Sequence, residues 1–88
     1  MAAEDRVQRI EALLRNALAA TDVQVIDESH QHRGHAGAAG GAGHFRVVVV
    51  SPRFAGLSLV AAQRLVYEAV GAMMDTEIHA LAITTRTP

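Results

Sequence analysis

The sequence predicts an α+β domain in which two helices cover one face of a three-stranded sheet, in the order α-β-β-α-β. Three observations support this fold class. Apolar residues recur at helical spacing in two segments, β-branched residues gather in three others, and a long glycine-rich segment separates the first two strands. The length of 88 residues fits a single domain over residues 1–88.

The first helix is predicted over residues 4–19, because its apolar residues form one stripe along the helix surface. The stripe consists of Val7, Ile10, Leu13, Leu14, Ala17 and Leu18. Glu4 and Asp5 in the first turn are favourable beside the positive end of the helix dipole. The β-branched alternation over residues 23–27 then predicts a short strand.

Residues 30–43 are predicted to form a long loop, because they hold five of the seven glycines and no large aliphatic side chain. A loop of this length in so small a domain is usually functional or disordered. Residues 45–50 form the clearest predicted strand, which Pro52 ends because proline cannot donate to a sheet. The two strands should therefore make a hairpin with the loop at its tip.

A second helix is predicted after Ser58, which is a suitable N-cap residue. Its apolar stripe consists of Ala62, Leu65, Val66, Ala69, Val70 and Met73. Asp75 and Thr76 are expected to end this helix, and residues 77–85 are expected to form the third strand.

The composition narrows the function classes. Eight arginines, no lysine and nine acidic residues give a formal charge of −1, which argues against tight nonspecific binding to nucleic acid. No apolar run approaches the roughly 20 residues that a membrane span needs, and the N-terminus does not read as a signal peptide. The expectation is a soluble, cytoplasmic protein without disulfides. No serine has the context of a nucleophile and no phosphate-binding glycine motif occurs, so no catalysis is expected.

Histidines carry the strongest functional signal. Four of the five, His30, His32, His35 and His44, lie in or next to the predicted loop, and the fifth, His79, lies in the apolar run 78–83. Gathered histidines indicate metal ligands. Because the chain has no cysteine, a second protein is expected to complete the site.

Several stretches, in the same order along the chain, resemble the BolA family. They are Asp27-Glu28-Ser29, the segment from His44 to Ser51, the segment from Arg53 to Ser58, Arg64-Leu65-Val66-Tyr67, and the segment from His79 to Ile83. The resemblance implies an α+β fold akin to the type II KH domain. It also implies partnership with monothiol, CGFS-type glutaredoxins, with which BolA-like proteins share a [2Fe-2S] cluster.

In that shared cluster the glutaredoxin and a bound glutathione supply thiolates, and the BolA-like chain supplies a third-strand histidine and a loop residue. The resemblance assigns the third-strand ligand to His79. Counting forward from Asp-Glu-Ser assigns the loop ligand to His32, whereas counting back from His44 assigns it to His35, which is slightly preferred. His44 is expected to support the site rather than to bind metal.

The rival function is a KH-like transcriptional regulator that binds nucleic acid. Its candidate phosphate contacts are Arg53, Arg64 and Arg86. The family pattern before the Val-Tyr pair resembles Arg-His-Arg, but this chain has Ala62-Gln63-Arg64, so nucleic-acid binding is the less favoured function.

Overall fold

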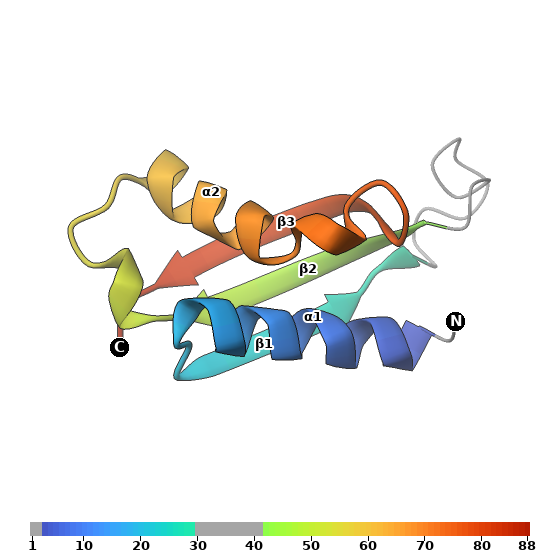
Figure 1. The fold of residues 1–88 in the computed structure, drawn as a ribbon, viewed down its shortest axis with the longest axis horizontal. Helices are drawn as coiled ribbons and strands as arrows, with labels where there is room; N and C mark the ends of the chain where they lie inside the picture. Colours follow the sequence, from blue (N-terminus) through green and yellow to red (C-terminus); the bar gives the residue numbers. More distant parts are fainter. Residues whose placement is uncertain (1–2, 30–41) are drawn as a thin grey trace.

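The computed structural model describes residues 3–29 and 42–88, which follow the predicted order of elements (Figure 1). The helices are α1 (Ala3–Leu18) and α2 (Leu59–Ala69), and the strands are β1 (Asp22–Asp27), β2 (Gly43–Val50) and β3 (Ile78–Arg86). Two short 3-10 helices, η3 (Pro52–Phe54) and η4 (Gly71–Met73), flank α2. Among the described residues, no helix has the length and apolar character needed to cross a membrane.

The sheet is mixed, with β2 in the centre. β1 pairs with it antiparallel, with Val25 opposite Val47, so the predicted hairpin is confirmed. β3 pairs with β2 in parallel, with Ile83 opposite Val47. A parallel pair needs a crossover connection, which η3, α2 and η4 supply. The starts of β2 and β3 therefore lie at one end of the molecule, and their ends lie at the other (Figure 1).

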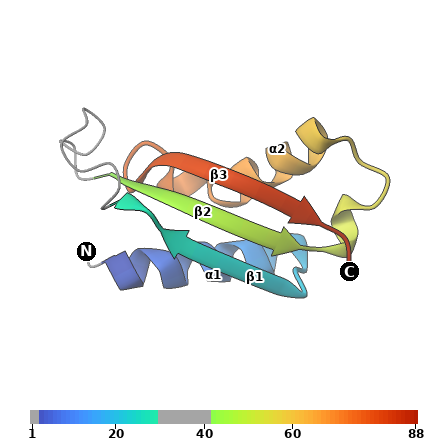
Figure 2. The ribbon, with the colours of Figure 1, turned by 180° about the vertical axis from the view of Figure 1, so that it is seen from behind.

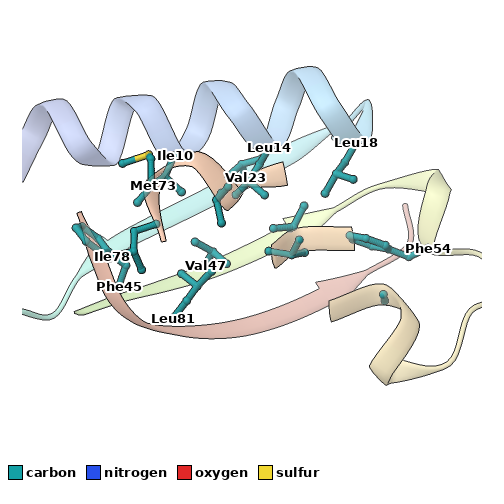
Figure 3. Packing of buried hydrophobic residues seen from close by; sticks show 14 residues of the cluster. Ile10, Leu14, Leu18, Val23, Phe45, Val47, Phe54, Met73, Ile78 and Leu81 are labelled. Carbon is teal, nitrogen blue, oxygen red and sulfur yellow. The ribbon is translucent and has the colours of Figure 1, made fainter. Parts of the chain in front are cut away.

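Both helices pack on one face of the sheet, and the other face is open (Figure 2). The core lies between these layers (Figure 3). It includes Ile10, Leu14 and Leu18 from α1, Phe45, Val47 and Val49 from β2, and Ala62, Val66, Val70 and Met73 from the α2–η4 segment. Because side chains alternate along a strand, His44, Arg46 and Val48 lie on the open face.

Two details differ from the sequence prediction. The second helix was expected to continue to Met73, but α2 ends at Ala69 and the chain tightens into a 3-10 turn. Gly71 weakens continuation of the α-helix, and the turn still buries Val70 and Met73. Ala17, predicted on the buried stripe of α1, is exposed. Its carbonyl accepts a hydrogen bond of 2.6 Å from Arg53 Nη1.

Candidate metal-binding site

A β-bulge at the start of β3 determines where His79 lies. Gly43 pairs with Ile78, but the next residue of β2, His44, pairs with Ala80, so His79 is the extra residue. Ile78 and Leu81 are buried, whereas the two residues between them are exposed. The bulge therefore places His79 and Ala80 in succession outside the core.

The same bulge brings two histidines together. The ring centroids of His44 and His79 lie 5.2 Å apart, with the ring planes inclined at 55°. His79 is exposed, whereas His44 is half-buried and its Nε2 is shielded from solvent. His79, the predicted third-strand ligand, and His44, the residue predicted to support it, are therefore neighbours in the structure.

The segment after β1 holds the backbone of His44 in place. Ser29 Oγ accepts a 3.0 Å hydrogen bond from the His44 amide, and the Glu28 amide donates to the His44 carbonyl at 2.8 Å. Asp27 Oδ1 in turn accepts from the Ser29 amide. Side-chain and backbone hydrogen bonds from Asp27-Glu28-Ser29 therefore fix the start of β2.

The turn before β3 is anchored to two other elements. Glu77 pairs with Arg9 of α1 at 2.5 Å, and its carbonyl accepts from the Gly43 amide at 3.0 Å. Asp75 adopts a left-handed conformation, with φ of 69°, and its amide donates to the Ile78 carbonyl. His79 therefore extends from a backbone that is held on both sides.

A shallow pocket of about 280 Å³ lies beside His44 on the sheet. Its lining includes Ala80 and Ala82, whose small side chains leave room above the strand, and Glu28 and Arg46, which pair at 3.2 Å. The small alanine side chains thus leave space for a second molecule to approach His44 and His79. The Glu28–Arg46 ion pair lies at the border of this space.

The loop histidines His30, His32 and His35 lie outside the described residues, so the choice between the two candidate loop ligands stays a prediction. Within residues 3–29 and 42–88, no three His, Asp or Glu side chains are grouped so that they could hold a metal ion. The part of the site that is described therefore consists of two imidazoles.

The arginines proposed for nucleic-acid binding are all exposed: Arg53 in η3, Arg64 in α2 and Arg86 at the end of β3. Arg53 and Arg64 lie on other elements than the histidine pair, and Arg86 lies at the opposite end of β3 from His79. Arg53 is engaged through its contact with the Ala17 carbonyl.

Sequence reasoning missed the structural roles of Ser29 and Gly43. It also missed the bulge, although a signal was present. The buried residues Ile78 and Leu81 are three positions apart, a spacing that breaks the period of two of a regular strand.

Comparison with known proteins agrees with this fold. A family model described as BolA-like protein matches residues 14–88. Protein BOLA1, chloroplastic, of Arabidopsis thaliana is 40% identical over 90 residues, covering 99% of this chain and 56% of the relative. The DNA-binding transcriptional regulator BolA of Escherichia coli is 39% identical over 80 residues, covering 91% of this chain and 73% of the relative.

Solved structures give the same result. The BolA domain of SufE1 from Arabidopsis thaliana has a TM-score of 0.84 at 37% identity, covering 99% of this chain and 96% of that one. BolA1 from the same plant has a TM-score of 0.81 at 40% identity, with the same coverage. The chain spans little more than half the length of the chloroplast BOLA1 relative. From the family match and the shared fold, this chain belongs to the BolA-like family.

Proposed function

We propose that this protein is an adaptor in iron–sulfur cluster assembly or iron homeostasis, which binds a monothiol glutaredoxin and co-ligates a bridging [2Fe-2S] cluster. The observation that carries the proposal is the His44–His79 pair. A β-bulge exposes one imidazole at the rim of the sheet and packs it against a second, backbone-anchored histidine.

The donor set suits a shared site better than a self-contained one. The chain has no cysteine, and the described residues offer two neighbouring imidazoles without a third donor group. Thiolates from the glutaredoxin and its glutathione would complete the ligands. His79 would bind iron directly, and His32 or His35 would be the second histidine ligand. Imidazole in place of thiolate removes negative charge and raises the reduction potential of a [2Fe-2S] centre.

The surface around the pair supports docking of another protein. Ala80 and Ala82 project little above β3, so a partner can approach His79 closely. The open face of the sheet bears no helix (Figure 2).

The test is to mix the purified protein with cluster-loaded monothiol glutaredoxin and to record visible absorption and circular dichroism. We expect a spectrum that differs from that of the glutaredoxin homodimer and that is lost in His79→Ala. Gln24→Ala is the matched control, because Gln24 is exposed on β1 and does not line the pocket beside His44. A homodimer spectrum at excess of wild-type protein would contradict the proposal.

A second candidate function is transcriptional regulation, favoured by the similarity to the Escherichia coli regulator. Arg64 and Arg86 would then contact phosphates. Binding of duplex DNA driven by such contacts should weaken steeply between low and physiological salt. We expect little binding at physiological salt, and submicromolar, sequence-selective binding there would reverse the order of the two candidates.

A further inference from the structure

A groove lies at the end of the molecule opposite the histidine pair. It has a volume of about 570 Å³ and lies between the turn before α2 and the end of β3. Its lining consists of Phe54, Leu57, Ser58, Leu59, Ala62, Thr85, Arg86 and Thr87. Four of these eight residues are apolar, three carry a hydroxyl group and one is an arginine, so the groove offers apolar and polar contacts in similar measure.

Large aliphatic side chains at this groove face solvent. Leu59 is 65% exposed, the adjacent Val60 is 64% exposed, and Leu57 is 43% exposed. Leu57 and Leu59 line the groove, and Val60 follows Leu59 directly without lining it. These three residues, called the exposed apolar patch, lie within four consecutive positions, whereas single exposed aliphatic residues are ordinary. Ser58, between Leu57 and Leu59, has a structural role, since its Oγ accepts from the Ala61 amide and caps α2.

The charged residue that lines the groove is basic. Arg86 lines the groove, and no carboxylate does. Arg64 lies four residues after Val60, on the same side of α2. Glu68, four residues after Arg64 on that side of α2, is the acidic residue nearest to the patch along the helix. In the sheet register, Asp22 lies across β2 from Arg86 and does not line the groove.

The groove is well separated from the histidines. His79 is the second residue of β3 and Arg86 is the last, a separation of roughly 20 Å for a strand that rises about 3.3 Å per residue. The groove therefore lies outside the immediate surroundings of His79.

We propose that this groove docks a segment of a second partner protein that carries aliphatic or aromatic side chains beside carboxylates. The apolar side chains would cover Leu57, Leu59 and Val60, and the carboxylates would pair with Arg86 and Arg64. This goes beyond the proposed function, because it gives the molecule a docking site that uses no histidine. The exposed aliphatic residues favour a peptide over a nucleic-acid backbone, which offers phosphate and sugar to such a surface.

The test is selection of binders from a random peptide library on wild-type protein, with counter-selection on the Leu59→Ser/Val60→Ser double variant. Selected peptides should combine apolar and acidic residues. In ¹H-¹⁵N correlation spectra they should shift the amides of residues 57–62 and 85–87. Affinity should fall about tenfold or more in the double variant, because two aliphatic contacts are lost. Ile26→Ser is the matched control, since Ile26 is 47% exposed on β1 and does not line the groove.

Charge reversal supplies the second readout. Arg86→Glu should weaken the binding of the acidic peptides. Peptides in which lysine replaces the acidic residues should bind the Arg86→Glu variant again. The proposal is overturned if no peptide is enriched, if basic peptides are enriched on wild type, or if the shifts lie elsewhere. It is also overturned if a DNA oligonucleotide displaces the peptides at physiological salt, because the groove would then bind nucleic acid. The same holds if sedimentation shows that the wild-type protein self-associates and that the double variant only abolishes this self-association, because the groove would then bind a second copy of the chain.

Discussion

Gly43 lies where the backbone of β2 has no room for a side chain. A Cβ atom there would lie 2.7 Å from Cε2 of the Phe45 ring and 2.7 Å from Ser29 Oγ. Phe45 is buried in the core, and Ser29 holds the His44 amide, so neither can move freely. A methyl group at this position would disturb the core and the histidine pair together.

We predict that Gly43→Ala lowers the free energy of unfolding by about 1–3 kcal/mol, as overpacking does. It should also shift the ring resonances of His44 and His79. Urea unfolding and NMR measure the two effects. Gly71→Ala is the control, because a Cβ at Gly71 meets nothing within 4 Å. Equal stability of the two variants would show that the Ser29–Gly43 contact does not constrain the site.

The loop ligand gives a second prediction at the scale of single residues. Only one of His32 and His35 should be bonded to iron, so His32→Ala and His35→Ala should reduce the mixed spectrum unequally. The larger loss identifies the ligand. A neighbouring histidine can rescue either variant in part, and the double variant should then match His79→Ala. Glutaredoxin affinity, measured by calorimetry, separates loss of docking from loss of ligation. Full retention of the spectrum in the double variant would exclude both residues.

For His79, the sequence predicts the residue but not its contacts. An imidazole within an apolar run, together with the family resemblance, is enough to single it out. Its contact with His44 could not be predicted, because the contact depends on a bulge between two strands that are distant in sequence. The sequence does not decide between His32 and His35 for another reason: counting from either end of the predicted loop gives two answers.

Among the elements, the end of β2 is tied to the end of α1 through Ser51. This residue is fully buried, and its Oγ donates to the Leu18 carbonyl at 2.5 Å and accepts from the Arg53 amide at 3.0 Å. The hydroxyl thus pairs with a buried carbonyl at the end of α1 and also caps the start of η3.

We predict that Ser51→Ala destabilises the protein by about 1–3 kcal/mol, because buried polar groups lose their partner. Ser58→Ala should cost only about 1 kcal/mol, the usual value for an N-cap in contact with water. Thermal and urea unfolding of both variants compare the two hydroxyls directly. A smaller loss for Ser51→Ala than for Ser58→Ala would contradict the role given to the buried hydrogen bonds.

Element boundaries follow the sequence where local chemistry decides them. The run Val47–Val50 and the cap at Ser58 predict β2 and the start of α2 correctly. The end of α2 does not follow, because Val70 and Met73 fit a helical stripe but reach the core from a 3-10 turn. The apolar pattern reports which residues are buried, and several backbone paths can bury the same residues.

At the scale of the whole molecule, the parallel pairing of β2 and β3 separates two surfaces. Both strands start at the histidine pair, and both end near the apolar groove (Figure 1). The core between them is continuous from Ile78 to Phe54 and includes no polar residue other than Ser51 among those described as buried (Figure 3). The two ends are therefore separated by one continuous, tightly buried apolar core.

We therefore predict that the two ends bind their partners independently. Variants more than about 10 Å apart without shared partners usually have additive effects. His79→Ala should abolish the mixed spectrum and leave peptide binding at the groove unchanged, and Leu59→Ser/Val60→Ser should do the reverse. Calorimetric titration of a selected peptide, with and without bound glutaredoxin, should give affinities that agree within about twofold, since a coupling of 1 kcal/mol or more would change them at least fivefold. A larger difference would mean that the sheet transmits a change between its ends or that the glutaredoxin reaches the groove, and chemical shifts of Val47 and Val66 in the core would distinguish these two causes.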